Sequence, residues 1–341
     1  MRVLVHIGAR KSGSTYMQDL FSANAERLQE VGTYYPSPEL SEGVHARGNG
    51  HPLAQALGGE ADGAAVQLCR TWMLDARSLS CERVLLSAEA LIGVLAESGS
   101  AARLIRIFKK AGFSEFRFLL VVRSPASALV SEYCHRIGIL TTSDYDSFLK
   151  GNPPYLSEVA GFVQHSLQEL EGVLEVRNYA GDSLLAVAAE FAGVALSSEL
   201  VGSRSHVSLT CEEADLVHAI ALTHPQYARD LRVRLQSLAV DKKASDAVKR
   251  SRWLQAAHLR VQESPDAWED LGKITRTDFL SPPPEVLLGG TDVCLSPEQI
   301  QVLLSVLTRR QRGWRHIVRR PARAISQMSG RRRLAASSSA R

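Results

Sequence analysis

The segment VLVHIGARKSGSTYMQDLF, from Val3 to Phe21, decides the fold of this chain. Its apolar start predicts a buried strand, and apolar residues near helical spacing after Ser14 predict an amphipathic helix. A glycine-rich turn between a strand and a helix directs backbone N–H groups at one spot, where the helix dipole adds partial positive charge. The segment therefore predicts an anion-binding loop over Gly8–Thr15.

The lysine of this loop does not stand where an ATP-binding loop has it. The pattern G-x-x-x-x-G-K-[ST] is met at Gly8 and Gly13, but Ser14 takes the place of its lysine, and the loop carries Lys11 instead. A Walker B strand ends in an aspartate that organises Mg²⁺, whereas two predicted strands end at Ser87 and Arg123. The loop therefore favours a nucleotide that is bound without a metal ion.

Strand and helix patterns alternate along the first half of the chain. Apolar runs predict strands at 3–8, 83–87, 116–122 and 173–178. Helices are predicted at 14–30, 52–57, 64–74, 101–111, 125–137, 156–170, 183–191, 212–222 and 297–307. This alternation predicts a P-loop-like three-layer α/β fold, with a central, mostly parallel sheet flanked by helices and a helical C-terminal part.

Composition narrows the class of protein. A chain of 341 residues that is 45% hydrophobic can form a substantial core. The five cysteines show no CxxC pair or zinc-finger spacing, so we expect free thiols in a reducing compartment and no metal site. No signal peptide and no apolar run of roughly 18 residues is present, which predicts a cytoplasmic protein.

The net charge of +4 hides a strongly basic tail. From Arg309 to Arg341 the chain has eleven arginines and no acidic residue, and without them 29 Lys and Arg face 36 Asp and Glu, a net charge of −7. We expect the tail, 309–341, either to be solvated and flexible or to make a peripheral contact. The partner in such a contact would be anionic lipid at the inner membrane face or anionic glycan. A nucleic-acid contact would carry no sequence specificity.

Two motifs resemble those of a known family. HIGARKSGST, residues 6–15, resembles the 5′-phosphosulfate loop of sulfotransferases that use 3′-phosphoadenosine 5′-phosphosulfate (PAPS), written P-K-[ST]-G-[ST]-[ST], with Arg10 in place of the usual proline. FLLVVRSPASALVSEYCHRI, residues 118–137, is similar to the family's 3′-phosphate motif, at Arg123, Pro125 and Ser131. The resemblance implies that Arg123 and Ser131 recognise the 3′-phosphate, which ATP lacks.

Weaker similarity extends the resemblance to about residue 215. SRSHVSLT, residues 203–210, resembles the family segment R-x-N-x-S-L-S near the adenosine, with His206 where asparagine is usual, and this implies roles for Arg204 and Ser208. We expect one sulfotransferase domain at 1–308, with a PAPS-binding core at about 1–215 and a helical part at about 216–308. The bacterial and carbohydrate-type branch is the most similar, which implies a saccharide or glycolipid acceptor, sulfated at a hydroxyl or an amine.

The resemblance also implies roles within the loop. Lys11 would stabilise charge on the bridging oxygen as the product PAP leaves. The PAPS-binding loop would comprise Arg10 and Lys11 together with the backbone N–H groups from Ser12 through Gly13 and Ser14 to Thr15, helped by the hydroxyls of the last two. Helix capping is the alternative role for those two hydroxyls.

The acceptor needs a general base, for which the sequence offers two candidates. Glu89 follows the predicted strand 83–87, at the carboxyl edge where α/β sheets place ligands. Its alternative role is to cap the helix that begins at Ala90. His51, in a loop after the first helix, is the second candidate, because similar bacterial members carry a histidine there. Two other functions stay open, a P-loop kinase or NTPase and a non-catalytic binder of nucleotide or glycan.

Overall fold

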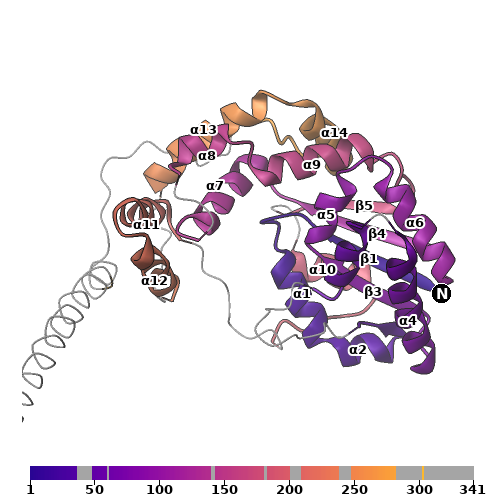
Figure 1. Cartoon of the computed structure of the whole chain (residues 1–341). Helices are drawn as coiled ribbons and strands as arrows, with labels where there is room; N and C mark the ends of the chain where they lie inside the picture. The colour runs from indigo at the N-terminus through magenta and orange to yellow at the C-terminus, as the bar shows by residue number, and fades with distance from the viewer. Residues whose placement is uncertain are drawn as a thin grey trace, which may run out of the picture.

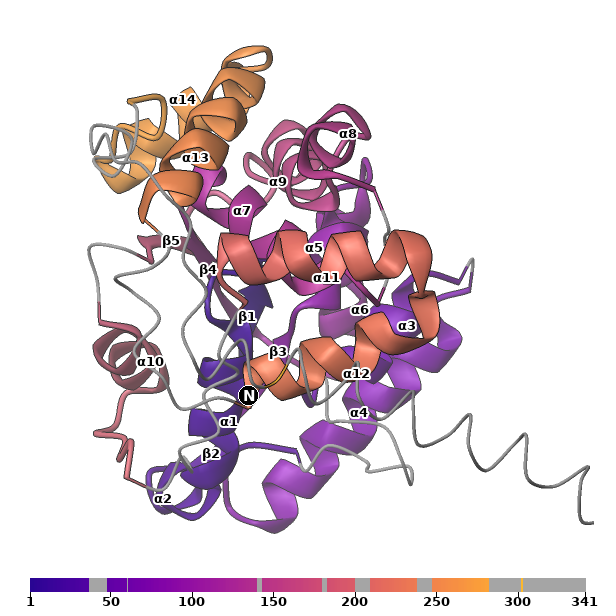
Figure 2. The same cartoon turned by 90° about the vertical axis from the view of Figure 1, so that its left-hand side faces the viewer.

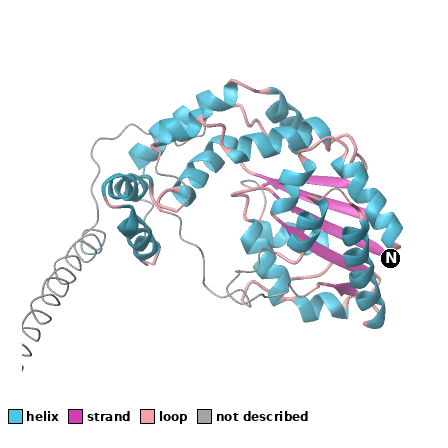
Figure 3. Ribbon diagram, in the orientation of Figure 1, coloured by secondary structure: helices cyan, strands magenta, loops and turns pink. Residues whose placement is uncertain are grey.

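In the part of the chain that the structure describes, the central feature is a parallel sheet of five strands in the order β2-β3-β1-β4-β5 (Figures 1 and 3). The structure, a computed structural model, describes residues 1–36, 48–59, 61–139, 143–179, 183–199, 209–237, 247–281 and 302. The strands are β1 (Arg2–Gly8), β2 (Thr33–Tyr34), β3 (Arg83–Ala88), β4 (Glu115–Val122) and β5 (Leu174–Asn178). The predicted α/β fold with a parallel sheet is therefore confirmed.

Strand β1 lies at the centre of the sheet because apolar side chains cover both of its faces. Val3, Val5 and Ile7 point into one hydrophobic core, whereas Leu4 points into the other. Both neighbours pair in parallel with β1, and the same register sets His6 beside Ser87 of β3 and Leu119 of β4. The carboxyl ends of β1, β3 and β4 consequently meet at one edge of the sheet.

Helices form a layer on each face of the sheet. One layer contains α1 (Ser14–Ala23), α2 (Ala25–Glu30) and α10 (Leu184–Ala192). The other contains α3 (His51–Leu57), α4 (Gly63–Ser78), α5 (Ala90–Leu95), α6 (Ser100–Ala111), α7 (Pro125–Arg136) and α9 (Pro154–His165). Because β1 leads to α1 on one face and its neighbour β3 leads to α5 on the other, their carboxyl ends form the kind of switch point at which open α/β sheets bind ligands.

The C-terminal helices pack on other helices more than on the sheet. They are α11 (Cys211–Thr223), α12 (Pro225–Gln236), α13 (Ala247–Gln262) and α14 (Asp266–Thr275). Helix α13 packs on α7 and α14 on α9 and the end of β5, while α11 and α12 form a pair on the side that faces the viewer in Figure 2. Trp253 of α13 stacks on Tyr145 of the short helix α8 (Tyr145–Lys150), with ring centroids 4.4 Å apart.

One predicted helix is wrong and several elements were not predicted. The expected helix 14–30 is two helices, because the side-chain amide of Asn24 donates to Leu20 O at 2.8 Å and to Ser197 O at 3.0 Å where the first helix ends. Strand β2 and helices α8, α12, α13 and α14 were not predicted. The predicted helix 297–307, apart from residue 302, and the tail 309–341 lie outside the described residues.

In the stretches that the structure describes, no helix combines the length and the apolar character that crossing a bilayer requires.

Candidate functional site

Hydrogen bonds within the loop between β1 and α1 help to hold its shape. Lys11 has a left-handed backbone conformation with φ of 60°, and Gly13, at φ of 82°, precedes the first residue of α1. The hydroxyls of Ser12 and Ser14 both donate to the carbonyl of Ala9, at 2.6 and 3.0 Å. The first N–H groups of a helix have no partner within the helix, so this loop offers donors at the carboxyl edge of the sheet.

Helix capping does not explain the two hydroxyls at the start of α1. The cap position is Gly13, and no side chain caps the helix. Ser14 bonds back to Ala9, and Thr15 is exposed. The capping alternative for these two residues is therefore wrong, and their role in phosphate binding stays a prediction.

Arg123 joins the two sequence motifs. It directly follows β4, and its Nη1 donates to the backbone carbonyl of Lys11 at 3.3 Å. The hydroxyl of Tyr155 donates to Arg123 O at 2.8 Å, and the Arg123 guanidinium lies 5.1 Å from the ring centroid of Tyr179. Segments more than a hundred residues apart in sequence thus meet beside the loop. Ser131 lies half-buried on α7, the helix that follows Arg123.

The charges that act on the Lys11 amine come from its own loop, from the turn after β3, and from helices α7 and α12. Burial lowers the pKa of Lys11 to about 8, the positive charges of Arg232 and Arg10 act in the same direction, and Glu89 and Glu132 oppose them. An amine with this pKa changes its charge just above neutral pH, which is typical of functional sites. Because Arg232 belongs to α12, the C-terminal helices contribute to the surroundings of the loop.

Glu89 lies against the loop, as its place after β3 predicts. A Cβ atom on Gly8 would be 2.8 Å from Glu89 Cα and 2.7 Å from Ser14 Oγ, so only glycine allows this approach. Glu89 occupies the cap position of α5, but its side chain makes no capping hydrogen bond. The capping alternative for Glu89 therefore stays open, since a carboxylate at this position is also favoured by the helix dipole. Its carboxylate is 40% exposed and lies 3.9 Å from Nη1 of Arg10.

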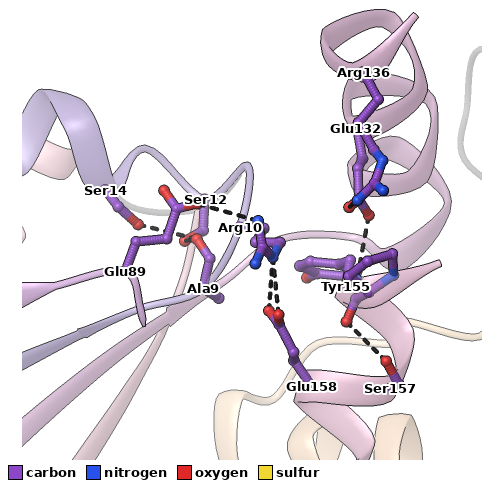
Figure 4. Close-up of polar contacts among 11 residues, drawn as sticks. Ala9, Arg10, Ser12, Ser14, Glu89, Glu132, Arg136, Tyr155, Ser157 and Glu158 are labelled. Carbon is purple, nitrogen blue, oxygen red and sulfur yellow. Dashed lines mark hydrogen bonds and ion pairs between the residues drawn. The ribbon is translucent and has the colours of Figure 1, made fainter. Parts of the chain in front are cut away.

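Arg10 extends from the loop to helix α9. Its Nε donates to both carboxylate oxygens of Glu158, at 3.0 and 2.9 Å. Figure 4 shows Arg10 between Glu89 on one side and Glu158 on the other. Burial raises the pKa of Glu158, and the charge and hydrogen bonds of Arg10 act against that rise. Arg10 therefore connects the loop to helix α9.

Sequence reasoning missed a buried carboxylate on α7. Glu132, next to Ser131 in the chain, is 2% exposed and accepts from Tyr155 N at 3.2 Å and from Arg136 Nη1 at 3.4 Å (Figure 4). Burial raises the pKa of Glu132. The hydrogen bond from Tyr155 N and the positive charges of Arg136, Arg10 and Lys11 act to lower it. The spacing of Glu132 and Arg136, four residues apart on a helix, was the readable signal. Glu158 had no such signal, because it meets Arg10 only in the folded chain.

The remaining predicted site residues are His51, Arg204 and Ser208. His51 is the first residue of α3, next to a loop whose Gly50 N–H donates to Ser87 O at 3.1 Å, so it lies near the end of β3. Its role as a base stays a prediction. Arg204 and Ser208 lie outside the described residues.

A hollow lies far from these residues. A cavity of about 750 Å³ at the opposite, amino-terminal edge of the sheet is lined by Arg2, Arg83 and Glu115 among others. Ligands of open α/β sheets bind at the carboxyl ends of the strands, so the loop edge is the better candidate. Within the described ranges, no three His, Cys, Asp or Glu side chains gather closely enough to hold a metal ion.

Comparison with known proteins gives one distant likeness. No protein-family model matches the chain, and no curated protein matches it. Among solved structures, the crystal structure of a sulfotransferase from Alicyclobacillus acidocaldarius matches at 16% sequence identity and a TM-score of 0.38, over 64% of this chain and 91% of that one. A likeness this distant carries no argument about activity, which rests on the residues described above.

Proposed function

We propose that this protein is a PAPS-dependent sulfotransferase. The observation that carries the proposal is the hydrogen bond of 3.3 Å from Arg123 Nη1 to the carbonyl of Lys11. This bond sets the cation of the proposed 3′-phosphate motif beside the proposed phosphosulfate loop. A nucleotide with phosphates at both its 5′ and 3′ positions would engage both motifs, whereas ATP would leave Arg123 without its ligand.

The residues present suit the nucleotide. Backbone N–H groups from Ser12 to Thr15 would hold the 5′-phosphate, in the way that helix N-termini bind phosphate. Arg123 would hold the 3′-phosphate with its planar set of donors, and Ser131 would add a hydroxyl. Arg204 and Ser208 remain proposed contacts near the adenosine on sequence grounds alone.

Two residues would carry the chemistry. Transfer breaks the bond between the sulfonyl sulfur and the bridging oxygen of PAPS and forms a bond from that sulfur to the acceptor oxygen or nitrogen. The protonated amine of Lys11 would stabilise the charge left on the bridging oxygen, which departs with PAP. Glu89 would take the acceptor's proton, because it is the exposed carboxylate against the loop. His51 is the second candidate for that base.

The acceptor class rests on the sequence resemblance. A saccharide or a glycolipid, sulfated at a hydroxyl or an amine, is the acceptor that we propose. The division into a PAPS-binding core at about 1–215 and a helical part at about 216–308 belongs to the same proposal, as does contact of the Arg-rich tail with an anionic membrane or glycan.

One observation favours a second candidate, an ATP-dependent kinase or NTPase. Strand β3 ends at Ala88, so Glu89 directly follows a strand next to β1. A carboxylate there resembles the acid that holds Mg²⁺ in ATP-binding loops. Against this function, the loop has no lysine after Gly13, and the cation Arg10 lies beside Glu89.

A turnover assay tests the proposed activity. The purified protein would be incubated with PAPS and a panel of neutral and amino sugars, and PAP and sulfated sugar would be measured by mass spectrometry. We expect both products to appear together, and Lys11→Met to reduce turnover by about 100-fold or more, the size of losing one charge-stabilising group. Lys109→Met, on the exposed face of α6, is the control and should keep full activity. If PAP binds but PAPS is never consumed, the protein is a non-catalytic binder.

A further inference from the structure

The ion pair between Arg10 and Glu158 leaves part of the guanidinium available. Both hydrogen bonds to Glu158 come from Nε, so the pair does not use the two terminal Nη groups. Nη1 is 3.9 Å from Glu89, beyond hydrogen-bond distance. The Arg10 side chain is 40% exposed, but Glu158 is only 18% exposed. Glu158 is thus the more buried partner of the pair, and Arg10 is the more exposed one.

Arg10 occupies a particular place within the site. It precedes Lys11 in the loop, and its side chain lies between Glu89 and Glu158 (Figure 4). In the proposed reaction, Lys11 acts on the bridging oxygen and Glu89 on the acceptor. The sulfonyl group would cross from the bridging oxygen to the acceptor, so a guanidinium that belongs to the residue before Lys11 and lies 3.9 Å from Glu89 would be close to its path.

We propose that Arg10 binds the sulfonyl oxygens of PAPS during transfer, and that Glu158 is the positioning residue that holds Arg10 for this contact. The inference rests on the proposed function and deepens it. A planar guanidinium presents several donors at fixed angles, which suits a group that carries three oxygens. The bond from Nε to Glu158 fixes the plane of the guanidinium in advance, so little ordering is needed when the ligand binds.

Comparing PAPS with PAP isolates this contact, because PAP lacks only the sulfonyl group. Both ligands would be titrated by calorimetry into the wild type, Arg10→Ala and Glu158→Gln. Hydrogen bonds to charged groups contribute enough to predict that Arg10→Ala weakens PAPS binding by about 10- to 100-fold. PAP binding should change by less than about 3-fold. Glu158→Gln should weaken PAPS selectively but less, because the glutamine keeps the size of the side chain.

Three further variants sharpen the test. Arg10→Ala/Glu158→Gln should lose no more PAPS affinity than Arg10→Ala alone, because Glu158 acts through Arg10. Arg10→Lys should restore part of the selectivity for PAPS over PAP. Asp62→Asn is the matched control, since it breaks an ion pair of the same kind, with Arg103 Nε at 2.8 Å, on the helix layer away from the loop, and should leave both affinities unchanged.

The outcomes separate this inference from the proposed function. Equal weakening of PAPS and PAP by Arg10→Ala would assign Arg10 to the 5′-phosphate and overturn the inference. Unchanged affinities for both ligands would leave the ion pair with a structural role only and would also overturn it. If the wild type binds neither PAP nor PAPS, the proposed function itself fails. Denaturant unfolding of each variant would establish that it is folded before titration.

Discussion

Burial lowers the pKa of the Lys11 amine to about 8, well below that of an exposed lysine. An unfolded chain would hold its proton up to about pH 10.5, so between these two values the unfolded state binds more protons than the folded one. The contribution of Lys11 to the free energy of unfolding consequently rises with pH between about pH 8 and pH 10.5. The same titration sets the charge of the loop, because the amine is positive below pH 8 and loses its charge above it.

Binding of PAP should therefore take up protons in mildly alkaline solution. The phosphate dianion favours the charged amine, so the complex holds a proton that the free protein has partly lost. We expect no uptake through Lys11 below about pH 7, clear uptake near pH 8.5, and PAP affinity that falls as the pH rises further. Calorimetry in buffers of different ionisation enthalpy measures the uptake. The same uptake in Lys11→Met would show that another group is responsible.

Among single residues, the sequence identified those that lie within a short motif. Lys11 and Arg123 each stand inside a motif, next to a strand end that an apolar run predicts. Glu158 and Tyr155 gave no local signal, because their contacts with Arg10 and Arg123 arise only when α9 folds across the edge of the sheet. Site residues that act through tertiary contacts are beyond what motif spacing can predict.

The turn from β1 into α1 depends on a glycine that has a positive φ and lies against the Leu184 side chain. Gly13 has φ of 82°, and a Cβ there would overlap Leu184 of α10 and lie 3.1 Å from Tyr179. The turn is therefore held from outside by the segment that follows β5. This contact places the Gly8–Thr15 loop beside Tyr179, over whose ring the Arg123 guanidinium lies.

Gly13→Ala should lower the free energy of unfolding by more than the strain of its left-handed backbone conformation alone. Gly172→Ala is the matched control, since Gly172 has φ of 80° but no atom within 4 Å of the added Cβ. We expect the control to lower the free energy of unfolding by about 1 kcal/mol, from the left-handed conformation. Gly13→Ala should lose roughly 1–3 kcal/mol more through overpacking.

Denaturant unfolding measures both variants of this pair. PAP affinity should fall for Gly13→Ala and stay unchanged for Gly172→Ala. Equal losses of stability in the two variants would mean that the contact with Leu184 does not constrain the loop.

Strands were most predictable where apolar residues dominate. Strands β1, β3 and β4 are mostly apolar, because a central parallel strand is buried on both faces. The edge strand β5, LEVRN, is partly exposed and has only two apolar residues, although a strand was predicted there. The two residues of β2 give no periodic pattern to read. Helices α12 to α14 were missed because they pack on other helices in a charged segment, where the apolar stripe is narrow.

At the scale of the whole molecule, one buried arginine connects the C-terminal helices to the site. Arg232 of α12 is 2% exposed, and its Nη1 donates to Cys134 O at 2.8 Å and to Ile137 O at 3.0 Å. These carbonyls lie at the end of α7, where a cation complements the helix dipole. The same helix carries Ser131 and Glu132, so α12 supports it from its C-terminal end.

Arg232→Met should destabilise the fold and alter the titration of Lys11. Two buried carbonyls would lose their donor, which predicts a loss of about 2–3 kcal/mol in the free energy of unfolding. Because the charge of Arg232 lowers the pKa of Lys11, its removal should move the pH dependence of PAP binding to higher pH. Arg229→Met, exposed on the same helix, should change neither quantity. An unchanged unfolding free energy for Arg232→Met would contradict this account of α12.

The central claim is that Gly8–Thr15 and Arg123 form one site for a nucleotide with a 3′-phosphate. The most direct test is calorimetric titration with PAP, compared with ATP and Mg²⁺, on the wild type and on Arg123→Ala. Arg117→Ala, at the other end of β4, is the control. We predict that PAP binds more tightly than Mg·ATP, and that Arg123→Ala weakens PAP by about 10- to 100-fold, as expected for a charged hydrogen-bonding partner. Preference for Mg·ATP, or PAP affinity that does not depend on Arg123, would contradict the claim and favour a kinase or NTPase instead.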